Sequence, residues 1–286
     1  MIYNFGSINA DYIYQVPHLP VPGETLAATA LTRELGGKGA NQSVAASRAG
    51  AQVIHVGAVG PDGAWAISEL EGHGVDCTHV TMLDSLTGHA IINVDTSGEN
   101  AIVIFPGANQ EQSLTDVEAA FMVAGQGDFL LLQNETNLQA DVAKLARSKD
   151  MTVVYSAAPF SPDSVRAVLP YVDILVMNSV EFSQLTEVLG DTISDLPAMV
   201  QIVTKGSAGV DWIENETTRH VPAPQVKPVD TTGAGDCFAG YVVAGLAEGM
   251  SPEEALRLGT SAAALQIQRR GTAGAIPIRS DVNALL

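Results

Sequence analysis

Asp230-Thr231-Thr232-Gly233-Ala234-Gly235-Asp236 is the most informative stretch of this chain, because a helical pattern over Cys237–Glu248 follows it directly. Its glycines allow unusual backbone dihedrals, so that consecutive N–H groups can point at one bound anion. The N-terminus of the following helix adds its partial positive charge at the same place. Asp236 is therefore either a simple helix cap or a base that lies beside a bound phosphoryl group.

A second glycine-rich segment, Gly36-Gly37-Lys38-Gly39-Ala40-Asn41, also opens a predicted helix. Lys38 and Asn41 occupy neighbouring positions of its first turn. Asn9 and Asp11 follow the first predicted strand two residues apart, so their side chains project to the same side. Such side chains suit the recognition of sugar hydroxyls, and they suit tight turns equally well. The chain has no GxxxxGKS or GxxxxGKT loop and no GxGxxG after a strand, which disfavours both familiar nucleotide-binding motifs.

Outside these segments, short runs rich in Val and Ile alternate with helical patterns. This alternation predicts a mostly parallel sheet with helices on both faces, a three-layer α/β/α domain formed by residues 1–286. Strands are predicted at 2–5, 53–57, 129–132, 153–155, 174–177 and 202–204, with further strand-like runs at 210–213 and 217–221. Helices are predicted at 39–49, 62–71, 138–149, 162–169, 180–189, 237–248 and 252–268.

Two segments, 11–32 and 88–106, do not follow the alternation of strands and helices, because they consist of β-rich runs and turn residues. They resemble antiparallel ribbons that could meet as a small second sheet over one end of the main domain. We interpret this sheet as a lid, although an ordinary edge hairpin would give the same pattern.

Composition excludes several classes of function. The 286 residues are 46% hydrophobic and 16% charged, and the formal net charge is −18, so a nucleic-acid or anionic-membrane surface is not expected. No apolar run is long enough for a membrane span and no secretory signal is recognisable, which predicts a cytoplasmic protein. Cys77 and Cys237 should be reduced, packed thiols, and the six scattered histidines do not indicate a transition-metal site.

Taken together, the glycine segments and their surroundings resemble the ribokinase-like (PfkB) carbohydrate kinase family. The resemblance extends from Gly6 to about Pro277. It is carried by Gly6-Ser7-Ile8-Asn9-Ala10-Asp11, Pro22-Gly23-Glu24-Thr25, Gly36-Gly37-Lys38-Gly39-Ala40-Asn41-Gln42, Thr87-Gly88, Gly98-Glu99-Asn100, Gly107-Ala108-Asn109 and the 230–236 stretch.

The resemblance implies transfer of the γ-phosphoryl group of ATP to a primary hydroxyl of a small sugar, with D-ribose as the expected acceptor. It places Asp236 as the catalytic base and the amides of Gly233, Ala234 and Gly235 as an anion hole. Around the sugar it places Asn9, Asp11, Gly37, Lys38, Asn41, Glu135 and Asp236. It implies that ATP and Mg²⁺ are bound by Asn178, Glu181, Thr204, Gly206, Gly209 and Gly235. It also implies that K⁺, if used, is bound near Asp230, Thr232 and Gly271. A homodimer formed through the lids is a further implication.

The chain also departs from the family pattern. Ser156-Ala157 replaces a usual Asn-Pro, and Ala273-Gly274-Ala275 replaces a more polar stretch. Three alternatives remain open. Tyr12 and Tyr14 could stack on the base of a nucleoside, a phosphosugar kinase would need more cations than the segment 11–47 offers, and the fold could serve a non-catalytic sugar or nucleotide sensor.

Overall fold

The structure is a computed structural model that describes residues 1–190, 199–215 and 217–286. Within these ranges, nine strands form the main sheet in the order β13-β12-β11-β10-β9-β8-β1-β4-β5. From β5 to β11 all neighbours are parallel, whereas β12 and β13 are added antiparallel at one edge. The strands are β1 (Ile2–Phe5), β4 (Val53–Val59), β5 (Asp76–Met82), β8 (Phe129–Gln133), β9 (Thr152–Ser156), β10 (Ile174–Asn178), β11 (Val200–Thr204), β12 (Val210–Glu214) and β13 (Thr217–Val221).

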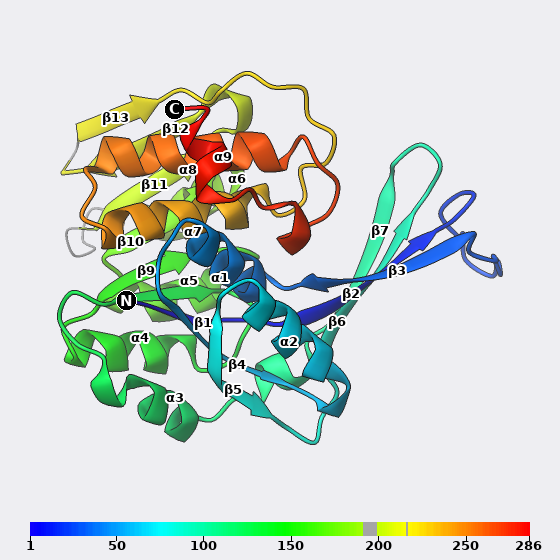
Figure 1. The fold of residues 1–286 in the computed structure, drawn as a ribbon, viewed down its shortest axis with the longest axis horizontal. Helices are drawn as coiled ribbons and strands as arrows, with labels where there is room; N and C mark the ends of the chain where they lie inside the picture. Colours follow the sequence, from blue (N-terminus) through cyan, green and yellow to red (C-terminus); the bar gives the residue numbers. More distant parts are fainter. Residues whose placement is uncertain (191–198, 216) are drawn as a thin grey trace.

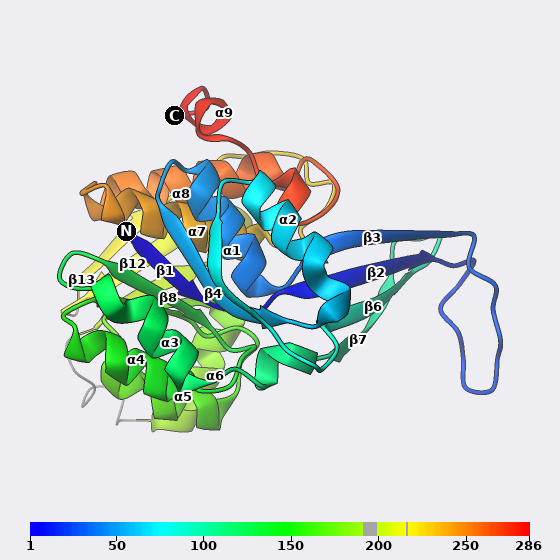
Figure 2. The ribbon, with the colours of Figure 1, turned by 60° about the horizontal axis from the view of Figure 1, so that its bottom comes forward.

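Helices cover both faces of this sheet (Figures 1 and 2), which confirms the predicted three-layer architecture. One face carries α1 (Lys38–Arg48), α2 (Ala64–Gly72), α7 (Ala234–Ala247) and α8 (Pro252–Gln266), and the other carries α3 (Leu114–Ala120), α4 (Gln139–Ser148), α5 (Pro162–Val168) and α6 (Ser179–Leu189). The short α9 (Arg279–Asn283) packs near α8. No helix within the described ranges is both long and apolar enough to cross a membrane.

Two apolar cores lie between the layers. Along β8, Leu131 packs into the core under α1 and α7, whereas Leu130 and Leu132 pack into the core on the opposite face. Successive side chains of a strand point to opposite faces, so a strand covered on both sides reads as an unbroken apolar run. This is why the central strands were recognisable in the sequence.

Helices α1 and α7 pack very closely, and this contact positions the site. A Cβ atom at Gly240 would lie 2.5 Å from the Ala45 Cβ and 2.6 Å from the Gln42 carbonyl oxygen, so only glycine allows this approach. The N-terminal parts of the two helices, which carry Asn41, Gln42 and Asp236, are therefore neighbours.

A smaller sheet projects as an arm from the main domain (Figures 1 and 2). In the described residues it has four strands in the order β3-β2-β6-β7, namely β2 (Asn9–Gln15), β3 (Ala30–Gly36), β6 (Gly88–Val94) and β7 (Asn100–Phe105). The pairs β2–β3 and β6–β7 are antiparallel ribbons, and β2 joins them by pairing parallel to β6. The two predicted segments thus lie in one sheet. The strands of the first segment run from Asn9 to Gly36, slightly beyond its predicted limits, and those of the second lie within 88–105.

Candidate functional site

The candidate site lies where the parallel strands end. Gln133 ends β8, Ser156 ends β9, Asn178 ends β10 and Thr204 ends β11. Carboxyl ends of parallel strands meet at one edge of a sheet, which is where α/β proteins bind their ligands. The start of α7 and the base of the small sheet adjoin this edge.

The glycine-rich turn adopts the geometry that its sequence predicts. Gly233 has φ of +74°, in the left-handed region, and α7 begins at Ala234. The Ala234 amide donates to the Thr231 carbonyl at 3.3 Å, whereas the next two amides stand in the first turn, where a helix offers no internal acceptor. Gly235 and Asp236 both line a cavity of about 180 Å³ in front of this helix terminus. The turn can therefore offer N–H donors to an anion.

The Asp236 side chain is not a helix cap. Its carboxylate is 7% exposed and accepts hydrogen bonds from Asn41 Nδ2 at 3.1 Å and Gln42 Nε2 at 3.0 Å, both on α1. Lys38 lines the same cavity, and the negative charge of Asp236 raises the pKa of its ammonium group against the effect of burial. A carboxylate fixed by two amides and facing a cation is suited to act as a base.

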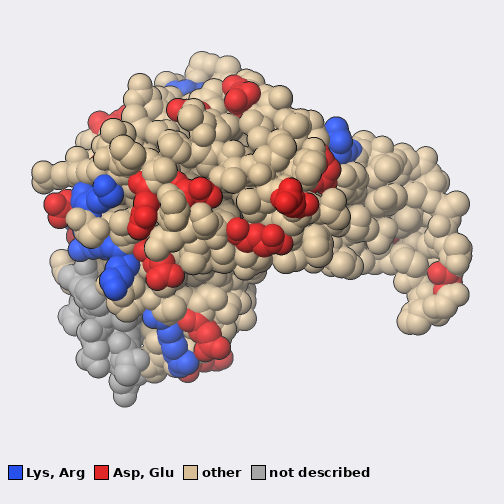
Figure 3. Space-filling view, turned by 90° about the horizontal axis from the view of Figure 1, so that it is seen from below, with Lys and Arg blue, Asp and Glu red and all other residues tan. Residues whose placement is uncertain are grey.

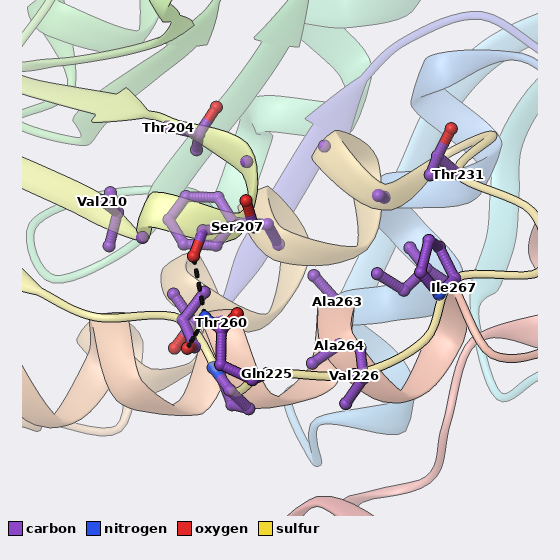
Figure 4. Close-up of a pocket in the computed structure, with 18 residues that line it drawn as sticks. Thr204, Ser207, Val210, Gln225, Val226, Thr231, Thr260, Ala263, Ala264 and Ile267 are labelled. Carbon is purple, nitrogen blue, oxygen red and sulfur yellow. Dashed lines mark hydrogen bonds between the residues drawn. The ribbon is translucent and has the colours of Figure 1, made fainter.

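The cavity in front of the turn continues into a second one of about 320 Å³, and both are lined by Thr204, Thr231, Ala234 and Gly235. Figure 4 shows the larger cavity between the end of β11 and helix α8, with Ala263, Ala264 and Ile267 on the helix side. The predicted residues Gly206 and Gly209 also line it. An apolar slot that opens toward a helix N-terminus fits a flat aromatic base with phosphates attached.

Asn178 and Glu181 lie at the smaller cavity but also form the N-terminal cap of α6. Asn178 Oδ1 accepts the amides of Val180 and Glu181 at 2.9 Å each, and Glu181 Oε2 accepts the Asn178 amide at 2.8 Å. This capping box leaves the second carboxylate oxygen of Glu181 for another partner.

The predicted sugar-binding residues meet at the base of the small sheet. Asn9 Oδ1 accepts a hydrogen bond from Asn109 Nδ2 at 2.8 Å. Glu135 Oε2 accepts from Ser7 Oγ at 2.5 Å and from the Lys38 amide at 3.0 Å. Gly37 has φ of +90°, and a Cβ there would lie 2.9 Å from the Asn9 nitrogen.

Two polar side chains at this base, Asn41 and Asp11, stand out. Asn41 Oδ1 is buried and has no hydrogen-bond partner among the described residues, and it belongs to the side chain that holds Asp236. Burial, reinforced by the charges of Glu135 and Glu34 and opposed by Lys38, raises the pKa of Asp11 to about 7. A buried polar atom without a partner, such as Asn41 Oδ1, indicates a place where a polar ligand completes the structure.

The proposed cation ligands lie behind the turn. Asp230 accepts the Thr232 amide at 3.0 Å and the Gly271 amide at 3.1 Å, one with each carboxylate oxygen. Burial would raise the pKa of Asp230, but these hydrogen bonds outweigh it and hold the pKa below its usual value. In the described part of the chain, no three His, Cys, Asp or Glu side chains converge as a metal cluster.

Two residues of the site have no role that the sequence predicts. Gln42 is the last residue of a family motif, yet it bonds directly to Asp236. Asn109 belongs to another family motif, and its amide holds Asn9. Their burial, 0% exposed for Gln42 and 2% for Asn109, was the missing signal.

Comparison with known proteins agrees with this geometry. The model of the pfkB family carbohydrate kinases matches residues 1–279. This chain belongs to that family. As a pfkB-family carbohydrate kinase, it is a phosphotransferase that acts on a sugar hydroxyl.

Three relatives illustrate the similarity of this pfkB-family kinase to known proteins. Ribokinase from Haemophilus influenzae is 36% identical over 294 residues, covering 96% of this chain and 95% of the relative. The structure of ribokinase from Thermotoga maritima matches with a TM-score of 0.88 at 33% identity, covering 99% of this chain and 98% of the other. Ribokinase from Arabidopsis thaliana, solved in complex with ribose and ATP, matches with a TM-score of 0.87 at 29% identity, covering 99% and 97%.

Proposed function

We propose that this kinase transfers the γ-phosphoryl group of ATP to the primary hydroxyl of D-ribose and forms ribose 5-phosphate. The observation that carries the proposal is the position of Asp236. Its buried carboxylate lies at the N-terminus of α7, between the cavities suited to a nucleotide and the polar side chains at the base of the small sheet. The relatives described above carry the name ribokinase, which supports ribose as the acceptor.

Asp236 acts as the base in this scheme. It takes the proton of the sugar hydroxyl as that oxygen attacks the γ-phosphorus, the bond to the β-phosphate oxygen breaks, and ADP leaves. A positioned general base contributes about 10² to 10⁴ in rate. The amides at the start of α7 stabilise the charge on the phosphoryl oxygens, with Gly235 better placed than Ala234 because the Ala234 amide already donates to Thr231.

Asn9, Asp11, Asn41 and Glu135 hold the sugar hydroxyls, with Lys38 beside them. Their oxygens and amides offer both donors and acceptors, as a polyol requires. The free Oδ1 of Asn41 gives a sugar hydroxyl an acceptor next to the base. Asn41 therefore both binds the sugar with Oδ1 and positions the base with Nδ2.

Mg²⁺ fits the donor set at the smaller cavity. Mg²⁺ keeps several waters and needs only one or two protein carboxylates beside substrate phosphates, and the second oxygen of Glu181 supplies such a group near Asn178. When bound with ATP, the ion neutralises charge on the β- and γ-phosphates.

A monovalent cation is also part of the proposal. The Asp230 carboxylate has lone pairs left after its two amide bonds, and it ties the loop at Gly271 to the turn at Thr232. Hard cations prefer such carboxylate and carbonyl oxygens. K⁺ bound there would stabilise the turn that presents the amides of α7.

We further propose that the small sheet is a lid and that two copies of the chain pair through it in the cytoplasm. Every residue of β7 is exposed, including Ile102, Val103, Ile104 and Phe105 at 52%, 67%, 57% and 48%. The arm shows few charged side chains in Figure 3. An edge strand with this much apolar surface is normally covered.

The substrate test is a coupled ADP-release assay with ATP and a panel of pentoses, hexoses and nucleosides. Turnover with D-ribose well above the other acceptors is expected, with the product identified as the 5-phosphate. Preference for a nucleoside would favour the nucleoside kinase alternative. Tyr12, a residue that could stack on a base, lies edge-to-face against His89 with ring centroids 6.2 Å apart. Binding of ribose and ATP without turnover would identify a sensor.

A further inference from the structure

Five buried polar side chains lie in the core next to Asp236, and the phosphoryl-transfer scheme leaves them without a role. They come from four different elements, β1, α1, β4 and β8, and each is 0% exposed: Asn4, Gln42, Ser43, His55 and Gln133. Burying polar groups destabilises a core unless each is hydrogen-bonded, and apolar residues of the same volume would serve stability as well. Such a set therefore needs a reason beyond folding.

These side chains form one continuous chain of hydrogen bonds that ends at Asp236. Asn4 Nδ2 donates to the Gly39 carbonyl at 2.7 Å and to Ser43 Oγ at 2.8 Å. Gln133 Nε2 donates to Asn4 Oδ1 at 2.7 Å and to Gln42 Oε1 at 2.8 Å. Gln42 Nε2 then donates to Asp236 Oδ1 at 3.0 Å.

The direction of every bond in this chain is fixed by backbone carbonyls. The Gly39 oxygen can only accept, so Asn4 must turn its NH₂ group toward it and its oxygen toward Gln133. Gln133 must then present its NH₂ group to both neighbours, which leaves its own Oε1 without a partner among the described residues. Gln42 consequently accepts with its oxygen and turns its NH₂ group toward Asp236.

At the end of the network farthest from Asp236, the donors and acceptors of His55 and Ser43 are fixed in the same way. His55 Nε2 lies 3.2 Å from the Gly6 carbonyl oxygen and Nδ1 lies 2.8 Å from Ser43 Oγ. Burial lowers the pKa of His55 to about 4, so the ring is neutral, with its proton on Nε2 facing the carbonyl. Nδ1 then accepts the Ser43 hydroxyl proton, which leaves Ser43 Oγ to accept from Asn4.

We infer that Gln42 is a positioning residue for phosphoryl transfer, oriented by Gln133 and Asn4 so that an N–H donor always faces the Asp236 carboxylate. The inference rests on the proposed role of Asp236 as base. The donor holds one carboxylate oxygen in place, so that the remaining lone pairs of Asp236 can receive the sugar proton. Asn41 holds the other oxygen but also faces the sugar, whereas Gln42, fully buried, reaches the reaction only through Asp236.

Gln42→Met tests this inference, because methionine keeps the shape of glutamine and removes the donor. We expect kcat to fall about 10- to 100-fold, the effect of losing one hydrogen bond to a charged group, while KM for sugar and for ATP changes less than threefold. Gln42→Glu replaces the N–H donor next to Asp236 with a second carboxyl group. We expect the acid limb of its kcat–pH profile to lie at higher pH than in the wild type, because two adjacent carboxyl groups do not both ionise readily.

A matched serine pair separates positioning from stability. Ser43 and Ser47 lie one turn apart on α1, and Ser47 Oγ donates to the His73 carbonyl at 2.8 Å, outside the network. Ser43→Ala should lower kcat several-fold, with Gln133→Met acting in the same direction, whereas Ser47→Ala should leave kcat unchanged. Ligand binding by calorimetry confirms that each variant is folded.

Three outcomes decide the matter. A kcat within threefold of wild type in Gln42→Met, with Asp236→Asn inactive in the same assay, overturns this inference and leaves the proposed function intact. Full activity of Asp236→Asn overturns both. If Gln42→Met does not fold, the pH profile of Gln42→Glu decides, and an acid limb at the wild-type position overturns the inference.

Discussion

Replacing Asp11 with asparagine should stabilise the protein without ligands, and increasingly so at higher pH. The pKa of Asp11 is raised from 3.8 to about 7, first by burial and then by the carboxylates of Glu135 and Glu34. Below pH 3.8 the group is protonated in both folded and unfolded chains and has no effect. As pH rises, the unfolded chain releases its proton first, so the folded state loses relative stability until the loss is complete above pH 7.

The magnitude follows from the size of this shift. A rise of about three units corresponds to about 4 kcal/mol at high pH, as an upper bound. At pH 5 the wild type has lost only part of this stability. The stability advantage of Asp11→Asn over wild type should therefore grow by about 2 to 3 kcal/mol between pH 5 and pH 9. In a chain of this size, that corresponds to a Tm difference that widens by about 4 to 6 °C.

Thermal unfolding of both proteins at several pH values, without sugar or nucleotide, measures this difference. Asp95→Asn is the control, because hydrogen bonds from Ser97 lower the pKa of the exposed Asp95 and its contribution is lost only as pH falls through that low value. Its Tm difference from wild type should be constant between pH 5 and pH 9. A Tm difference that is equally constant for Asp11→Asn would refute the reasoning.

The other predictions concern the sugar site, the cation and the dimer. Asp11→Ala should raise KM for ribose about 10-fold or more and leave KM for ATP within twofold, since a sugar hydroxyl loses a charged acceptor; equal effects on both constants would place Asp11 outside the sugar site. Gly36→Ala should act in the same way with little loss of Tm, because the added Cβ would lie 2.0 Å from Asp11 Oδ2 and displace a flexible side chain; unchanged sugar KM contradicts this. Initial rates at constant ionic strength should rise with K⁺ relative to Na⁺, and Asp230→Ala should abolish that response; a flat wild-type response would remove the cation from the account. Ile104→Asp should convert a dimer to a monomer in light scattering, and a monomeric wild type would disprove pairing through the lid.

Much of the fold could be predicted because the central strands are buried on both faces. The strands β8 and β10 are apolar up to their last residue, and β1 is apolar except for Asn4. The predicted limits of all three lie within one residue of the observed ones. Strand β5 was missed because its exposed residues interrupt the apolar run, with buried Cys77 between exposed Asp76 and Thr78. The short α3 was missed as well, since seven residues give too little periodicity.

The site was predictable in part for a similar reason. The glycine turn and the Lys38 segment can be recognised from the local sequence, so Asp236 and its neighbours could be predicted as site residues. The partner of Asp236 could not, because Gln42 lies 194 residues away and only the close packing of α1 on α7 brings the two together. The raised pKa of Asp11 also depends on Glu135, which no local pattern connects with it.

The most direct test of the account compares wild type with Asp236→Asn in phosphorylation of D-ribose by ATP, with ribose 5-phosphate identified by mass spectrometry and phosphorus NMR. The wild type should form this product, and the variant should bind ribose and ATP with little change while kcat falls about 10² to 10⁴-fold. Wild-type protein that makes no ribose 5-phosphate, or a variant with kcat within a few-fold of wild type, would contradict it.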